Sequence, residues 1–327
     1  MQPVASRAPR ALAITLAITL AITLALAGCA RTPEPLRDSR AALGTIVTLT
    51  AYGSDAEAMR SSADAAYDAI QAVESELDAH DPASAIGRVN ATEAPELERL
   101  PARAEAALDA ICELEVREWF SPHLWAASEA WGFGDGERVP TQAELAVALE
   151  DTRYDFGGAA KGLALHEALA ALRAQGSVDA AIISSASTTM TFGAKPGGEP
   201  WRIGVEDPRI PGAVVATVEA TGEITVSTSG DYQRYFERDG IRYHHILDPA
   251  TGMPVRGLRS LTVVGEISGL HSDILSTALF VAGPQAAADY ARERGLGLVI
   301  VDDEGRTRIV PAPEGASWSV AASRVEE

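Results

Sequence analysis

The 327-residue chain carries 46 acidic and 27 basic residues, so its formal net charge is −19, and 46% of its residues are hydrophobic. This length and apolar content provide a substantial core in one large domain or two smaller ones. The acidic balance argues against a surface that binds nucleic acid or an anionic membrane. An anionic ligand would therefore need a cation or backbone amides in its immediate neighbourhood.

The N-terminus has the pattern of a targeting segment. Two arginines precede an uncharged apolar run over residues 11–27, and the run ends in Leu-Ala-Gly-Cys at Cys29. Small residues before such a cysteine resemble the bacterial lipobox, which implies cleavage before Cys29 and lipid on its sulfur; a retained membrane anchor is the alternative. We therefore expect a lipoprotein signal peptide over 1–28 and a lipidated tether over 29–39. This places the protein on the extracytoplasmic face of a bacterial cell membrane.

Hydrophobic periodicity predicts mainly helices in the first half of the remaining chain. A first strand around residues 43–51 is followed by an amphipathic helix over 55–77 and a helical region over about 101–131. A capping box at Thr141 and Glu144 marks a further helix.

The second half is richer in strands. Candidate strands cover residues 180–184, 201–205, 213–219, 224–227, 241–247, 261–264 and 298–301. Helices are expected over 273–282 and 286–294. This order predicts an α+β fold, with helices mainly in the first half and an antiparallel or mixed sheet mainly in the second. We expect a single catalytic domain over 40–318 and a flexible tail over 319–327.

The stretch YDFGGAAKG at 154–162 is a candidate ligand-binding segment. Its small residues let a ligand approach the backbone closely, and the following residues have helical periodicity. Exposed amides at a helix N-terminus suit an anion, and Lys161 adds a positive charge. An ordinary strand-to-helix turn is the alternative. The stretch is neither the Gly-x-Gly-x-x-Gly dinucleotide fingerprint nor a Walker loop.

Asp273 and Thr277 form a second candidate. They are four residues apart on a predicted helix, so their side chains lie on one face, one turn apart. Oxygen ligands of this kind suit Mg²⁺, which takes few protein ligands and keeps phosphate oxygens and water. Ser276 could support such a site. The alternative is that Asp273 complements the helix dipole and that Thr277 packs.

His244 and His245 form a third candidate, beside the turn that contains Pro249. A histidine here could supply a general base near neutral pH. Strand geometry sends the two side chains to opposite faces, so at most one reaches a given substrate atom. The alternative is one structural and one exposed histidine.

Taken together, these segments resemble the ApbE family, the FAD:protein FMN transferases. Eight motifs occur in the family's order: LGT at 43–45, DPASAIGRVN at 81–90, WGFG at 131–134, DFGGAAKG at 155–162, PWRIGVEDP at 200–208, SGDYQRYF at 229–236, HHILDPATG at 244–252 and SDILSTALF at 272–280. The resemblance implies a single ApbE-like, T-fold-like catalytic domain.

The resemblance also implies an activity. The family cleaves the pyrophosphate of FAD with Mg²⁺, with Mn²⁺ a possible replacement, and transfers FMN to a threonine hydroxyl on an acceptor protein of redox or electron-transfer type. AMP leaves. Asp273 and Thr277 would be metal ligands, with Ser276 beside them and an oxygen from the turn at Gly158. His245 or His244 would activate the acceptor hydroxyl. Contacts to FAD would come from Leu43, His80, Trp119, Phe120, Ser121, Asp155, Lys161 and Ile246.

The chain departs from the family pattern at four places. Leu43 stands where methionine is usual, and His80 where an aromatic residue is common. Ser121-Pro122-His123 replaces Asp-Pro-Thr, and the segment 185–189 replaces Gly-Gly-Asp. The last two changes favour a non-catalytic flavin-binding lipoprotein. A third alternative is a pyrophosphatase that converts FAD to FMN and AMP.

Overall fold

The structure is a computed structural model that describes residues 34–134 and 136–323. The predicted signal peptide and Cys29 lie outside the described residues. The chain divides after Glu34, and the elements described below belong to the unit that begins at Pro35.

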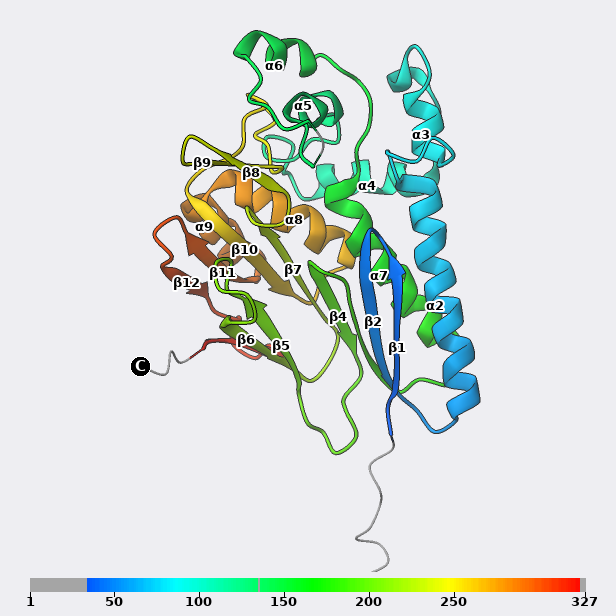
Figure 1. Cartoon of the computed structure of the whole chain (residues 1–327). Coiled ribbons are helices and arrows are strands. Elements are labelled where there is room, and N and C mark those ends of the chain that lie inside the picture. Colours follow the sequence, from blue (N-terminus) through cyan, green and yellow to red (C-terminus); the bar gives the residue numbers. More distant parts are fainter. Residues whose placement is uncertain (1–33, 135, 324–327) are drawn as a thin grey trace, which may run out of the picture. The chain divides into compact units, whose positions relative to one another are not determined.

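An eight-stranded sheet with the order β1-β2-β3-β4-β7-β10-β11-β12 organises this unit (Figure 1). All of its pairings are antiparallel. Its strands are Leu36–Ala42 (β1), Thr45–Tyr52 (β2), Ala180–Ser184 (β3), Thr188–Phe192 (β4), Ile224–Gly230 (β7), Leu258–Gly265 (β10), Gly297–Asp302 (β11) and Thr307–Val310 (β12).

The inner strands β7, β10 and β11 are buried on both faces, and their successive side chains point to opposite sides of the sheet. On β10, Val263 belongs to the large core formed with the helices, whereas Val264 packs against a second sheet. That second sheet has the order β13-β6-β5. Its strands are Trp201–Glu206 (β5), Val214–Ala220 (β6) and Trp318–Ala322 (β13).

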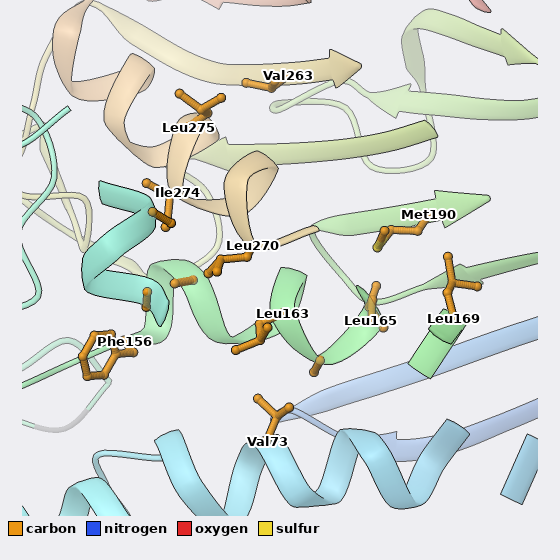
Figure 2. Close-up of a cluster of buried hydrophobic side chains, with 14 of the residues drawn as sticks. Val73, Phe156, Leu163, Leu165, Leu169, Met190, Val263, Leu270, Ile274 and Leu275 are labelled. Carbon is orange, nitrogen blue, oxygen red and sulfur yellow. The ribbon is translucent and has the colours of Figure 1, made fainter. Parts of the chain in front are cut away.

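Helices cover the other face. Figure 2 shows α7 between α2 and α8, with buried side chains from these helices and from the sheet residues Met190 and Val263. The helices in this layer are Ala56–Leu77 (α2), Ala102–Glu113 (α4), Gly157–Ala174 (α7), Gly269–Ala282 (α8) and Pro284–Arg294 (α9). None of the helices in the described parts of the chain is both long and apolar enough to span a membrane.

The helices α7 and α8 touch backbone to backbone. A Cβ atom on Gly162 would lie 2.0 Å from the carbonyl oxygen of Gly269, and one on Gly269 would lie 2.1 Å from the carbonyl oxygen of Gly162. Only glycine permits this approach at either position. It brings the start of α7 against the first half of α8.

A smaller layer covers one end of the unit (Figure 1). Its elements are Trp125–Trp131 (α5), Gln142–Ala148 (α6), and the hairpin of Tyr235–Arg238 (β8) and Ile241–His244 (β9). The short helices Ala85–Asn90 (α3) and Pro95–Leu97 (η1) follow α2 in the chain, and Ile86 of α3 belongs to the large core. The indole of Trp131 joins α5 to this hairpin: its ring lies 5.2 Å from that of Tyr243 and 6.3 Å from that of Phe236. Its Nε1 also donates a hydrogen bond of 2.8 Å to the carbonyl oxygen of Gly252.

The predicted α+β order is confirmed, and the differences lie mainly at element boundaries. Residues 36–39, expected in the tether, form β1, whose residues alternate between half-buried and exposed as at a sheet edge. The expected tail is also ordered through 322, because β13 pairs with β6 and buries Trp318. The helical region over 101–131 is two helices, α4 and α5, with the segment 119–121 between them.

Candidate active site

A cavity of about 380 Å³ lies where the start of α7, the middle of α8, the end of β7 and several loops meet. Most of the predicted site residues line it. They are Leu43, His80, Trp119, Phe120, Ser121, Asp155, Gly158, Lys161, His245, Ile246, Asp273 and Thr277. Residues more than 200 positions apart in the sequence therefore share one site.

The carboxylate of Asp273 is fixed at the junction of α7 and α8. It is 4% exposed, and its Oδ2 accepts a hydrogen bond of 2.9 Å from the amide of Gly162. Its Oδ1 accepts one of 3.0 Å from the hydroxyl of Thr188 on β4. Burial raises the pKa of the Asp273 carboxyl, and the Lys161 ammonium and these hydrogen bonds partly offset that effect.

The oxygen donors beside Asp273 fit a magnesium ion. The Thr277 hydroxyl lies 3.1 Å from the Ser229 hydroxyl. A Cβ atom on Gly158 would lie 3.4 Å from the Thr277 hydroxyl, so the backbone of Gly158 is close to Thr277. That Cβ would also lie only 2.8 Å from the Phe120 ring. Within the described ranges, no three His, Cys, Asp or Glu side chains are grouped to hold a metal. One carboxylate with neutral oxygens suits Mg²⁺, which retains phosphate and water ligands.

Ser276 differs from this expectation. It is 1% exposed and does not line the cavity. Its hydroxyl donates 3.0 Å to the backbone carbonyl of Asp273 and lies 3.0 Å from the Ser229 hydroxyl. The prediction that Ser276 is one of the metal ligands is therefore corrected: Ser276 contacts Asp273 and Ser229 from the side away from the cavity.

The two histidines lie on opposite sides, as strand geometry predicted. His244 is 3% exposed and points away from the cavity. Its Nε2 lies 2.7 Å from the carbonyl oxygen of Val255, and its Nδ1 accepts from the amide of Ile246 at 3.3 Å. Both ring nitrogens are occupied, so His244 cannot act as the base considered for it.

His245 faces the cavity with one ring nitrogen available. Its Nδ1 lies 3.3 Å from the carbonyl oxygen of Arg234. A carbonyl only accepts hydrogen bonds, so Nδ1 carries the proton and Nε2 presents a lone pair. Desolvation lowers the pKa of His245 to about 3, with repulsion from Arg234, His244 and Lys161 adding to the shift. The imidazole is therefore neutral, the form that a general base requires.

The departures from the family pattern have local replacements. The imidazole of His80 lies 4.6 Å from the ring of Trp125, so an aromatic pair remains at this wall. The Ser121 hydroxyl accepts a hydrogen bond of 3.1 Å from the amide of His123. The carbonyl of Pro122 accepts one of 2.7 Å from the amide of Asp155, which keeps this segment attached to the start of α7.

Several polar residues that line the cavity were not assigned from the sequence, and Arg234 and Ser187 are two of them. Arg234 lines it, and no carboxylate among the described residues forms an ion pair with its guanidinium. The residue lies in the recognised SGDYQRYF motif. Because β8 and β9 pair Tyr235 with His244, a hairpin prediction would have placed Arg234 opposite His245. Ser187, at the tip between β3 and β4, also lines the cavity.

This arrangement defines a class of protein: an α+β fold with a cavity lined by a buried carboxylate, neutral oxygens, a lysine and a neutral histidine. Residues 43–300 match the model of the ApbE family, and the chain belongs to that family. The prediction made from the eight motifs is confirmed.

Solved structures and sequence relatives agree with this assignment. The ApbE protein of Thermotoga maritima superposes with a TM-score of 0.75 at 29% identity, over 84% of this chain and 96% of that one. The flavinyl transferase ApbE of Pseudomonas stutzeri gives 0.71 at 28% identity, over 90% and 96%. The FAD:protein FMN transferase of Rhodobacter capsulatus is 34% identical over 216 residues, which is 59% of this chain and 40% of that protein. That of Escherichia coli K12 is 34% identical over 166 residues, 50% and 46%. The chain thus spans about half the length of these curated relatives.

Proposed function

We propose that this protein transfers FMN from FAD to a threonine hydroxyl on an acceptor protein of redox or electron-transfer type, in a Mg²⁺-dependent reaction that releases AMP. The supporting observation is that Asp273, the start of α7 and the available nitrogen of His245 all face one cavity. Relatives that carry the name FAD:protein FMN transferase give independent support.

The residues suit each part of the transfer. The acceptor oxygen forms a bond to the phosphorus of the FMN half, and the bond from that phosphorus to the bridging oxygen breaks, so that AMP leaves. The hydroxyl proton passes to Nε2 of His245. Lys161 lies at the start of α7, where its charge reaches the pyrophosphate.

Asp273, Thr277 and a backbone oxygen near Gly158 would hold Mg²⁺, which supplies charge neutralisation to the pyrophosphate. This explains how a chain of net charge −19 could accept an anionic dinucleotide. The fit of the donor set rests on the buried carboxylate and on the hydroxyl that lies beside the glycine backbone.

The test incubates the protein with FAD, MgCl₂ and a candidate acceptor domain from a redox protein, alongside the acceptor's Thr→Ala variant. We expect mass spectrometry to show the acceptor heavier by FMN less one water, with an equal amount of AMP. Chelation of Mg²⁺ and the Thr→Ala acceptor should both abolish labelling. Free FMN and AMP without labelled acceptor would identify a pyrophosphatase, and unchanged bound FAD a non-catalytic flavin-binding protein.

We further propose that lipid on Cys29 anchors the protein at the extracytoplasmic face of a bacterial membrane. The support is the pattern of residues 11–29. In metabolic labelling with a tagged fatty acid, Cys29→Ser should take up no lipid while FMN transfer is retained. Cys112→Ser is the matched control, because Cys112 is exposed and should leave anchoring unchanged. Lipid incorporation into Cys29→Ser would contradict the proposal.

A further inference from the structure

The hairpin tip between β3 and β4 fixes the position of Ser187. The amide of Ser185 donates a hydrogen bond of 2.8 Å to the carbonyl of Thr188, which closes the turn. The carbonyl of Ser187 accepts one of 2.8 Å from the amide of Thr228 on β7. The backbone of Ser187 is therefore held from both neighbouring strands.

The hydroxyl of Ser187 is buried and has no hydrogen-bond partner among the described residues. Two other buried hydroxyls share this condition, those of Ser260 and Ser272. Only Ser187 of the three lines the main cavity. A buried polar group without a protein partner is costly, and at a residue that lines a cavity a bound ligand can supply that partner.

The neighbours of Ser187 indicate which part of a ligand would reach it. The next residue, Thr188, donates to the Asp273 carboxylate. Thr228, which holds the Ser187 carbonyl, precedes Ser229, whose hydroxyl lies 3.1 Å from that of Thr277. Ser187 is thus adjacent to the residues on both sides of the candidate magnesium site, where phosphate oxygens of the ligand would lie.

We propose that the Ser187 hydroxyl donates a hydrogen bond to a phosphate oxygen of FAD. This assignment rests on the proposed function and makes Ser187 a binding residue of that site. A hydroxyl donates to an anionic oxygen without adding charge, so it needs no compensating cation. The segment 185–189, which departs from the family's Gly-Gly-Asp, then serves the ligand in two ways: Thr188 orients Asp273, and Ser187 contacts phosphate.

The test measures equilibrium binding of FAD in the presence of Mg²⁺ for the full chain, Ser187→Ala and Ser260→Ala. Loss of a hydrogen bond to a charged group predicts that Ser187→Ala binds FAD about 10-fold more weakly. In competition experiments, inorganic pyrophosphate should also bind to Ser187→Ala more weakly than to the parent, by a similar factor. Ser260→Ala also removes an unpartnered buried hydroxyl, but outside the cavity, and should bind both as the parent does.

Thermal unfolding without ligand is the second readout. Ser187→Ala should be at least as stable as the parent, because alanine leaves no unpaired hydroxyl in the apo protein. Equal FAD affinity of Ser187→Ala and the parent would overturn the role of Ser187 while leaving the proposed function intact. Weaker FAD binding with unchanged pyrophosphate binding would overturn the phosphate assignment. Failure of the parent to bind FAD at all would instead refute the proposed function, and this inference with it.

Discussion

His245 lines the main cavity and His244 lines a second one, and the two cavities differ in how far their polar side chains are hydrogen-bonded within the protein. The second cavity, of about 180 Å³, is lined by His244, Arg209, Asp231, Arg242, Val255, Arg256, Leu258, Arg259 and Asp303. There Asp231 pairs with Arg209 through two hydrogen bonds of 2.7 and 2.6 Å, and both nitrogens of His244 are occupied.

The main cavity leaves its groups available. Arg234 has no ion pair among the described residues, the Ser187 hydroxyl has no partner there, and Nε2 of His245 faces the cavity. Six Asp, Glu, Lys or Arg residues line each cavity, yet in the second cavity the acid Asp231 and the histidine His244 are bonded within the protein. Unpartnered polar groups, rather than the number of charges, therefore distinguish a ligand site from a structural ion-pair network.

The largest expected effect tests the carboxylate of the main cavity. Asp273→Ala removes the only carboxylate of the candidate magnesium site and should slow Mg²⁺-dependent AMP release by roughly 10³-fold or more. Magnesium titration of the folded variant provides a direct second measurement. Asp303→Ala is the control, because Asp303 is an exposed acid of the second cavity whose Oδ2 accepts from Gly257. A similar loss in both variants would erase the distinction between the cavities.

The adjacent histidines give the sharpest matched pair. His245→Gln removes the candidate base and should lower the rate of AMP release by about 10²- to 10⁴-fold. His244→Gln should affect stability more than rate, because the buried ring of His244 bonds at both nitrogens. Equal loss of rate in the two variants, at equal folded fraction, would contradict the assignment.

The pH dependence follows from the same residue. Since the pKa of His245 is lowered to about 3, kcat/KM should stay constant as pH falls through about 6.5, where an ordinary histidine protonates. In the unfolded chain His245 takes up a proton near pH 6.5, whereas in the folded protein it does so only near pH 3. The free energy of unfolding should therefore decrease as pH falls from about 6.5 towards 3. His245→Gln should reduce this slope in unfolding measurements. An inflection in kcat/KM near pH 6.5 that disappears in His245→Gln would show that the pKa is not lowered.

The backbone contact between α7 and α8 lies beside the main cavity, and it can be broken directly. Gly162→Ala places a Cβ atom 2.0 Å from the carbonyl oxygen of Gly269 and should lower the free energy of unfolding by roughly 3 kcal/mol. Denaturant titration measures this loss. Gly222→Ala is the matched control, because its Cβ would meet nothing closer than the Ser317 hydroxyl oxygen at 3.6 Å.

The smallest effect concerns the arginines of the two cavities. Arg234→Ala should lower kcat/KM for FAD by about 10-fold, the cost of losing one hydrogen bond to a charged ligand group. Arg256→Ala removes an exposed arginine of the second cavity, whose guanidinium donates to the carbonyl of Arg242. That variant should retain the parent rate. A larger loss in Arg256→Ala than in Arg234→Ala would indicate that the ligand binds in the second cavity.

The sequence predicted the parts of the site that lie in strongly patterned segments. Lys161 and Asp273 stand in motifs with clear helical periodicity, and both line the cavity. The opposite directions of His244 and His245 followed from strand geometry alone. The choice between them could not be predicted, because it depends on hydrogen bonds to the carbonyl oxygens of Val255 and Arg234 and on one from the amide of Ile246.

The missed features have weak local signals. The edge strand β1 carries two arginines and an aspartate, a composition that also suits a tether. β13 is recognisable only through the burial of Trp318 against β6. Nothing within the segment 185–189 separates Ser187 from its neighbouring hydroxyls. Its role emerges only when β7 and α8 are placed beside it.

The indole of Trp131 affects the position of residues that line the main cavity, although Trp131 does not line it. It holds the β8–β9 hairpin through Tyr243 and the following turn through Gly252, while His245 lies between these two attachment points. A loss of packing at Trp131 would therefore let this wall of the cavity shift relative to Asp273 on its rigid helix pair. In the proposed transfer, alignment of the acceptor hydroxyl with the phosphorus would therefore depend on an aromatic residue that does not line the cavity.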